Sequence, residues 1–282
     1  MAGASMKDIK LRIRSVESTM QITKAMQLVA TSKLRRAKER MESSKPFGVL
    51  ARKAIAAAVA RCQDHNVPFL TPREVKRRCY VIIAGERGLA GGYNSNIFKA
   101  VAAHCQSMEY CVLPIGRKAI DKYQHMGVEL LDDSQYRVES ANVGACFRMA
   151  NRLVEGYNSQ QFDEVWLVYT DFHTMMDQQV AVERMLPIER ATLPEDATPV
   201  ATVYEEEPAE TLRQVVPDYL AGKLYSAVCD SFASEVAMRR NAMDSATKNA
   251  DAMISDLRLR YNRARQGAIT QEITEIVAGA EE

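Results

Sequence analysis

Apolar residues between Ile9 and Met41 recur at alternating steps of four and three, and Thr23 and Gln27 occupy the positions of the series between Met20 and Ala30. The positions of this series are Ile9, Ile13, Val16, Met20, Ala30, Leu34, Ala37 and Met41. A sustained repeat of this period is typical of a coiled-coil helix, which we expect from about Lys7 to Met41. Pro46 can kink or end the helix, but the helix-forming residues after it favour a continuation to about Cys62.

The end of the chain repeats this pattern. From about Val215 to Val277 there is no Pro after Pro217, and apolar residues recur every seven positions. These are Val236, Met243, Ala250, Leu257 and Ala264, with Ala246, Met253 and Ala268 near the alternate heptad positions. Sixty helical residues span about 90 Å, whereas a compact domain of this size is only ~30–40 Å across. We therefore expect the helix to project and to pair antiparallel with the N-terminal helix.

The middle of the chain alternates short β-rich apolar runs with helical segments. The predicted strands are residues 78–85, 110–116, 128–131, 164–172, 179–188 and 199–206. The predicted helices are Asn94–Gln106, 117–127 and Ala141–Gly156. This alternation indicates an α/β sandwich with a largely parallel sheet. The predicted fold class is thus α/β, with a central Rossmann-like domain inserted between the two helices of a long antiparallel coiled coil. The expected segments are 1–62, 76–207 and 208–282.

The net charge of +1 hides an uneven distribution. Between Met1 and Lys45 we count 11 Lys and Arg against 4 Asp and Glu, and between Ser159 and Pro217 we count 12 Asp and Glu against 3 Arg. A basic end and an acidic flank favour partners with defined charged patches over general polyanion binding.

Composition narrows the classes of protein further. No apolar run reaches the length of a membrane-spanning helix, and the first ten residues resemble no signal peptide. The six Cys are scattered without a Cys-x-x-Cys pair, which favours reduced and mostly buried thiols. Cys105 and Cys111 could form a dithiol, but nothing around them indicates a switch. The four His have no metal-ligand spacing, so we expect no metal or cofactor.

The segment "ITKAMQLVATSKLRRAKER" (residues 22–40) is basic and amphipathic. Nucleic acid, a membrane surface and a partner protein are all possible ligands of such a helix. Stacking aromatics are absent, as are the bulky anchors of a membrane-surface helix. We expect the apolar stripe of Ile22, Met26, Val29 and Leu34 to pack on the C-terminal helix, and the basic residues to face a partner protein.

The loop "GERGLAGGYNSN" (Gly85–Asn96) follows a strand and opens a helix, which is the setting of phosphate-binding loops. Its pattern matches neither a dinucleotide-binding nor a Walker A loop, so we favour a structural turn or a docking surface. Asp171 and His173 end a predicted strand, but a lone Asp-x-His pair does not make a catalytic set. We expect no catalytic residues.

Three blocks resemble signature segments of the gamma subunit of F-type ATP synthases, in the bacterial form. They are "IRSVESTMQITKAMQLVATSKLRRA", "GERGLAGGYNSNIF" and "YNRARQGAITQEITEIVAGA". The resemblance covers nearly the whole chain. It implies a non-catalytic central-stalk rotor subunit that couples ion flow through a membrane ring to ATP synthesis or hydrolysis in the beta subunits.

The resemblance also implies the partners and the location. The expected partners are the ring of alpha and beta subunits, the epsilon subunit and the c-ring, without nucleic acid. The expected location is peripheral, on the cytoplasmic side of the cell membrane, through the c-ring. The residues that match partner-binding or coupling positions of the family are Met26, Arg35, Arg36, Arg40, Glu235, Arg239, Arg265, Gln266, Thr270 and Glu272.

Two other functions stay open on the residues alone. One is a nucleotide-binding α/β enzyme with coiled-coil dimerisation arms, which predicts saturable nucleotide binding with turnover. The other is a basic coiled-coil tether for nucleic acid, which predicts steeply salt-dependent DNA binding.

Overall fold

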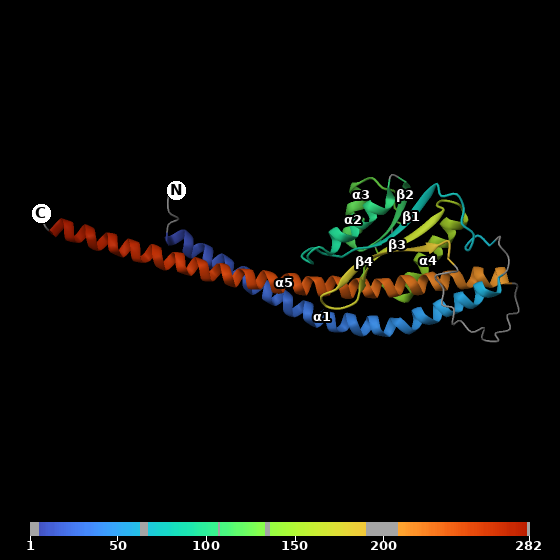
Figure 1. The fold of residues 1–282 in the computed structure, drawn as a ribbon, viewed down its shortest axis with the longest axis horizontal. Coiled ribbons are helices and arrows are strands. Elements are labelled where there is room, and N and C mark those ends of the chain that lie inside the picture. The colour runs from blue at the N-terminus through green and yellow to red at the C-terminus, as the bar shows by residue number, and fades with distance from the viewer. Residues whose placement is uncertain (1–5, 63–66, 107, 133–135, 190–207, 281–282) are drawn as a thin grey trace. The chain divides into compact units, whose positions relative to one another are not determined.

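The computed structural model describes residues 6–62, 67–106, 108–132, 136–189 and 208–280 (Figure 1). The chain divides into two compact units, Met1–Thr31 with Arg239–Glu282 and Ser32–Met238. We call the first the helix-pair unit and the second the α/β unit. Two long helices, α1 (Met6–Arg61) and α5 (Pro208–Ala280), contribute residues to both units.

In the helix-pair unit the first part of α1 runs antiparallel to the last part of α5. The Thr23 and Thr247 hydroxyls lie 2.8 Å apart in a hydrogen bond, and Arg258 Nη2 lies 2.9 Å from Glu17 Oε1. The earlier residue of α1 thus contacts the later residue of α5, so the two helices run in opposite directions. The expected antiparallel pairing of the terminal helices is confirmed.

The seam between these two helices follows the predicted heptads, with one exception. Its buried residues are Ile9, Thr23, Ala30, Met243, Ala250, Ile254 and Leu257. Met253, which we expected near the seam, is 46% exposed, whereas its neighbour Ile254 is only 4% exposed. Because successive helical residues are rotated by about 100°, a shift of one position moves a side chain from the seam to the surface.

The predicted packing of the basic amphipathic segment was partly wrong. Ile22 and Val29 are 58% and 57% exposed, and Met26 is half-buried, whereas Leu34 is buried. Thr23 and Ala30 occupy the seam instead, so the stripe of Ile22, Met26 and Val29 lies beside the seam. The heptad series, with its polar member Thr23, identifies the buried face better than the most apolar residues do.

The α/β unit is built on a four-stranded sheet in the order β2-β1-β3-β4. The strands are β1 (Arg77–Ile83), β2 (Glu109–Ile115), β3 (Glu164–Phe172) and β4 (Gln178–Leu186). The first three are mutually parallel, and β4 pairs antiparallel with β3. The expected largely parallel sheet is confirmed.

Helices cover both faces of this sheet (Figure 1). On one face α2 (Tyr93–Cys105) and α3 (Arg117–His125) pack Ile97 and Tyr123 against Tyr80 and Ile82. On the other face α4 (Val143–Asn158) packs together with the parts of α1 and α5 that belong to this unit. The three helices share one continuous core, which includes Leu153 of α4, Ile55 of α1 and Leu220 of α5. Burial on both faces explains why β1 reads as an uninterrupted apolar run.

Several expected element boundaries changed. Residues 128–131 do not form a strand; Leu130 makes only an isolated bridge to Val112. The predicted strand at 199–206 lies outside the described residues. Helix α1 continues through Pro46 to Arg61, and α5 begins at Pro208 and runs through Pro217.

Five of the six free cysteines are buried and Cys105 is half-buried.

Candidate functional site

The predicted coupling residues near the end of α5 are solvent-exposed. Arg265, Gln266, Thr270 and Glu272 are all exposed, and the described part of the chain from 269 to 277 has no buried side chain. Thr270 Oγ1 donates to the Gln266 carbonyl oxygen at 2.9 Å, which is a bond within the helix. Their side chains are therefore available to a partner.

Large apolar residues share this end of α5 with the polar ones. Ile269, Ile273, Ile276 and Val277 are 47–71% exposed. Scattered single apolar residues are normal on a protein surface, but a helix end with this many in two turns indicates contact with another protein. The heptad pattern of the sequence did not predict that these apolar residues are exposed and lie outside the seam between the two helices.

Met26 lies on α1 in the helix-pair unit and is half-buried. The next residue, Gln27, makes a polar contact between the two helices, in which its Nε2 donates to Asp244 Oδ1 at 2.8 Å. The hydrogen bond from Lys248 is the main cause of a lowered pKa of Asp244, and the Gln27 amide adds to it. Asp244 thus stays ionised at neutral pH.

The basic face of α1 in the α/β unit is divided between internal and external roles. Arg40 Nη1 donates to the Glu139 carbonyl oxygen at 3.0 Å, and Arg40 Nη2 donates to the Ala141 carbonyl oxygen. Its guanidinium also lies 5.5 Å from the centre of the Tyr225 ring. Lys33 Nζ lies 2.6 Å from Glu139 Oε1. These two side chains fasten α1 to the segment that precedes α4.

Arg35 and Arg36 point away from this attachment. The Arg35 side chain is 84% exposed and, among the described residues, its ion pair is with Glu39 on the next turn, at 3.6 Å; Arg36 is also exposed. An exposed ion pair of this type contributes little to stability. Arg35 and Arg36 are therefore free to meet an acidic surface.

Glu235 and Arg239 differ in environment although they lie one turn apart on α5. Arg239 is half-buried, whereas Glu235 is only 3% exposed and lies against the loop after β1. A Cβ built on Gly85 would lie 2.7 Å from Glu235 Oε1. The absence of a side chain at Gly85 thus lets α5 and this loop approach closely.

The Gly-rich loop between β1 and α2 is held by hydrogen bonds within the chain. Asn94 Oδ1 accepts from the Gly85 amide at 2.8 Å, and Glu86 Oε1 accepts from the Val138 amide at 2.9 Å. Leu89 and Gly91 have positive φ angles of 62° and 57°. A loop whose first amide and acidic side chain already have partners fits the structural-turn interpretation better than a phosphate cradle.

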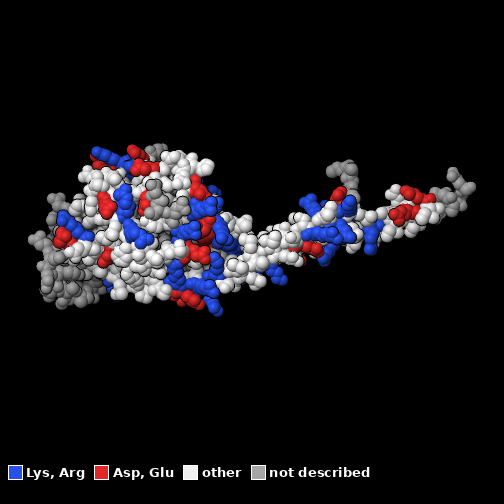
Figure 2. All heavy atoms as spheres, turned by 180° about the vertical axis from the view of Figure 1, so that it is seen from behind, with Lys and Arg blue, Asp and Glu red and all other residues white. Residues whose placement is uncertain are grey.

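In the described part of the chain, the Asp-x-His pair at the end of β3 lies at the surface, and no metal centre is assembled. Asp171 and His173 form an exposed pair at 3.4 Å. The described residues contain no cluster of three His, Cys, Asp or Glu able to hold a metal ion. In Figure 2, Lys and Arg alternate with Asp and Glu over much of the face shown. Such a surface offers no broad polyanion-binding patch on this face.

Among the described residues, no helix combines the length and the apolar character that a membrane span requires.

Sequence reasoning missed the internal use of Arg40 and Lys33. Their partners Glu139 and Ala141 lie about one hundred residues further along the chain. No local pattern marks which cation of a basic helix will meet a distant carbonyl group, so the sequence alone could not separate Arg40 from Arg35 and Arg36.

Comparison with known proteins gives consistent matches over nearly the whole chain. The family described as ATP synthase matches residues 5–282. The ATP synthase gamma chain of Ruminococcus albus is 43% identical over 280 residues, which is 97% of this chain and 96% of that protein. The ATP synthase gamma chain of Alkaliphilus metalliredigens is 39% identical over 285 residues and 99% of each chain.

A solved structure shows the same fold at lower sequence identity. It is a chain of the Euglena gracilis mitochondrial ATP synthase, from an assembly of OSCP, F1 and c-ring in rotational state 3. The TM-score is 0.69 at 19% identity, and the match covers 98% of this chain and 93% of that one. The expected fold class is confirmed.

Proposed function

The chain belongs to the gamma-chain family of ATP synthases, and from that premise we propose that it is the central-stalk rotor subunit of a bacterial F-type enzyme. In this role it couples ion flow through a membrane ring to ATP synthesis or hydrolysis in the beta subunits. It is itself non-catalytic. An asymmetric shaft favours a different conformation in each beta subunit only through differences in contact energy.

The observation that carries the proposal is the exposed end of α5. Its apolar residues Ile269, Ile273 and Ile276 are exposed, and polar residues lie between them. We propose that a ring of alpha and beta subunits encloses this end. Arg265, Gln266, Thr270 and Glu272 then contact loops of the beta subunits.

We assign the other predicted coupling residues by their exposure. Arg35 and Arg36 project freely and are proposed to meet an acidic loop of a beta subunit, as is the half-buried Met26. Arg40 is already bound to the segment before α4, so we propose that it positions the basic face and does not itself bind the loop. Glu235 is buried, which supports a positioning role, and the half-buried Arg239 is proposed to contact the ring.

The remaining partners are proposed on the family relationship. The α/β unit is proposed to bind the epsilon subunit and the c-ring. This places the protein peripherally at the cell membrane, on its cytoplasmic side. No nucleic acid or cofactor is part of the proposal.

Co-purification tests the assignment as a whole. A tagged chain expressed in its native cells should bring down alpha and beta subunits together with ATPase activity. A chain that purifies alone from gently solubilised membranes would contradict the rotor function. Saturable nucleotide binding with turnover on the isolated chain would favour the enzyme alternative.

A double substitution tests the coupling residues. Arg265→Ala with Gln266→Ala should lower ATP-driven ion pumping relative to ATP hydrolysis in the assembled complex. The matched control is Arg260→Ala with Asn262→Ala, which removes two exposed polar side chains from the same helix. Equal loss in both variants, or normal pumping in the first, would show that Arg265 and Gln266 are not coupling residues.

A further inference from the structure

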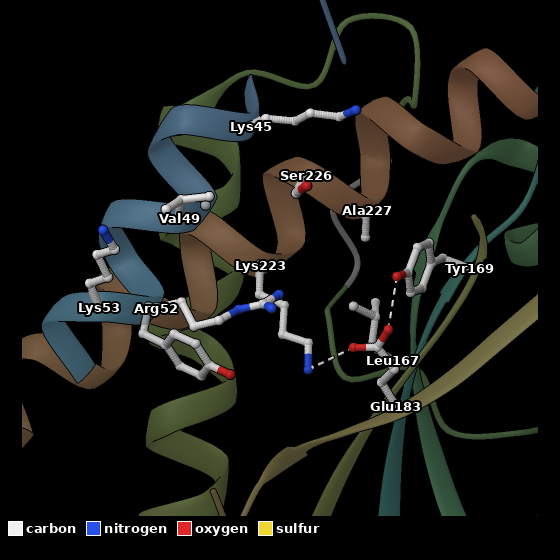
Figure 3. Close-up of a pocket in the computed structure, with 12 residues that line it drawn as sticks. Lys45, Val49, Arg52, Lys53, Leu167, Tyr169, Glu183, Lys223, Ser226 and Ala227 are labelled. Carbon is white, nitrogen blue, oxygen red and sulfur yellow. Dashed lines mark hydrogen bonds and ion pairs between the residues drawn. The ribbon is translucent and has the colours of Figure 1, made fainter. Parts of the chain in front are cut away.

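A cavity of about 430 Å³ lies within the α/β unit between α1, α5 and the sheet (Figure 3). Residues 45–53 of α1 form one wall and residues 219–227 of α5 form another. Leu167, Tyr169 and Glu183 close the cavity from β3 and β4. All of these residues belong to the same compact unit.

Cations predominate around this cavity. Lys45, Arg52 and Lys53 line it from α1, and Lys223 lines it from α5, against the single carboxylate of Glu183. Figure 3 shows the Lys223 amine reaching toward Glu183, while Lys45 extends toward α5. Within the described residues, no ion pair occupies Lys45, Arg52 or Lys53.

The one carboxylate does not offset these three cations, because its charge is already compensated. Lys223 Nζ lies 2.9 Å from Glu183 Oε2, and the Tyr169 hydroxyl donates to Glu183 Oε1 at 2.9 Å. Burial acts to raise the pKa of Glu183, but the Lys223 charge and hydrogen bond, the Tyr169 hydroxyl and the Arg52 charge lower it overall. Glu183 therefore stays ionised and paired with Lys223. Outside the lining, the Asp230 carboxyl faces Lys45, but its pKa is raised to about 7, chiefly by burial, so at neutral pH it offsets Lys45 only in part. The surplus at the rim is positive.

The floor of the cavity is apolar. Leu167 is fully buried and Ala227 is 3% exposed, whereas Val49 at the rim is 53% exposed. Ser226 and Tyr219 supply neutral hydroxyl groups from α5 to the lining. An apolar floor with a few polar groups at one side is the usual construction of a small-molecule site.

We propose that this cavity binds a small amphiphilic anion, a phosphate or carboxylate group carried on a compact apolar body. The anionic group lies among Lys45, Arg52 and Lys53, where the surplus charge is, and the apolar body lies on Leu167 and Ala227. Cations beside a low-dielectric wall concentrate anions more strongly than cations on an open surface. None of the proposed coupling residues lines this cavity.

The test uses phenyl phosphate as the probe and the purified full-length chain, with binding measured by calorimetry. Inorganic phosphate and phenol supply the anionic and the apolar part separately. Saturable binding of phenyl phosphate, tighter than that of either part, is the expected result. Absence of saturable binding, or equal binding of phenol, overturns the proposal.

Substitutions locate the bound probe. Lys45→Gln and Arg52→Gln should each weaken binding by about tenfold, as expected for loss of a charge-assisted contact. Lys99→Gln is the matched control, because Lys99 is an exposed lysine on another helix of the same unit. An equal loss in the control would mean that the probe responds only to surface charge.

A further variant blocks the cavity without removing charge. Val49→Trp places a large side chain at the rim, on an exposed helical position that should tolerate it. It should abolish phenyl phosphate binding while circular dichroism shows an unchanged fold. Unchanged binding in this variant would place the probe outside the cavity and overturn the proposal.

Discussion

Glu164 is a buried carboxylate that binds three donor side chains. Arg78 Nε and Trp166 Nε1 donate to Glu164 Oε2 at 2.8 and 2.9 Å, and Arg184 Nη1 lies 3.5 Å from Glu164 Oε1. Glu164 is 7% exposed, so its desolvation is offset only while these partners remain. Removing the carboxylate leaves two arginines and an indole N–H without their common acceptor.

Glu164→Ala should therefore lower the free energy of unfolding by about 2–4 kcal/mol, since a partly buried charge network is broken. Glu129→Ala is the control, because Glu129 pairs with Arg77 at 2.6 Å through a side chain that is 62% exposed. The control should cost about 1 kcal/mol or less. Urea unfolding of both variants measures the difference, and equal destabilisation would contradict a special role for Glu164.

Asp230 is a residue on α5 whose protonation changes near neutral pH. Burial raises its pKa to about 7, the Asp171 carboxylate adds to this, and Lys45 opposes it. The folded state therefore holds a proton that the unfolded state releases at lower pH. Because the native state binds more protons, stability from this group falls as pH rises.

Asp230→Asn should remove this pH dependence. Between pH 6 and pH 8 the native chain should lose about 1 kcal/mol of unfolding free energy relative to the variant. Asp244→Asn is the control: the pKa of Asp244 is lowered, so its contribution is lost only in acid and stays constant over this range. Parallel pH profiles for the native chain and Asp230→Asn, measured by urea unfolding, would show that Asp230 does not titrate there.

At the scale of elements, periodicity predicted the two terminal helices and their pairing well. Heptad positions such as Ala30 and Met243 lie in the seam. Burial on both faces made β1 recognisable as a continuous apolar run. The sequence failed where strong hydrophobicity and heptad position disagreed, as at Ile22 and Val29, because helical geometry and not side-chain hydrophobicity decides which residues face the partner helix.

Contacts between distant elements were beyond sequence reasoning. The attachment of Arg40 to the Glu139 carbonyl and the cavity between α1 and α5 both depend on tertiary packing. The candidate coupling residues came from family resemblance, and the structure separates the exposed Arg35 from the internally bound Arg40. Charge pattern alone assigns both to one surface.

The contact between the Gly85 loop and α5 makes a testable link between two elements. Gly85→Ala places a Cβ about 2.7 Å from Glu235 Oε1 and 3.2 Å from Asn94 Oδ1. Since Glu235 is buried and has little room to move, the variant should lose about 1–3 kcal/mol of unfolding free energy. Gly88→Ala is the control in the same loop, because a Cβ there meets nothing within 4 Å. Thermal unfolding compares the two variants, and equal effects would mean that the loop does not depend on close approach at Gly85.

The net charge of the chain is small, but positive and negative residues are concentrated in different regions of the sequence. The net charge is only +1, yet 11 of the Lys and Arg lie between Met1 and Lys45. Lys33 and Arg40 are used inside the α/β unit, whereas Arg35 and Arg36 are exposed. Other exposed cations of α1 are Lys7, Lys10, Arg12, Arg14, Lys24, Lys45, Arg52 and Lys53. Long-range attraction to an acidic partner is therefore shared among many exposed cations, and it should be sensitive to salt.

Arg35→Gln with Arg36→Gln should slow association of the chain with the complex of alpha and beta subunits. We expect about a fivefold decrease of the association rate at low salt, since exposed charges act mainly through steering. The decrease should shrink near 0.3 M salt, where the Debye length is only about 6 Å.

The control is Lys99→Gln with Arg148→Gln, which removes the same charge from exposed positions on α2 and α4. Stopped-flow mixing of labelled subunits at both salt concentrations measures these rates. If the control slows association equally, net charge rather than the basic face of α1 directs binding; if only dissociation changes, Arg35 and Arg36 act as contacts and not by steering.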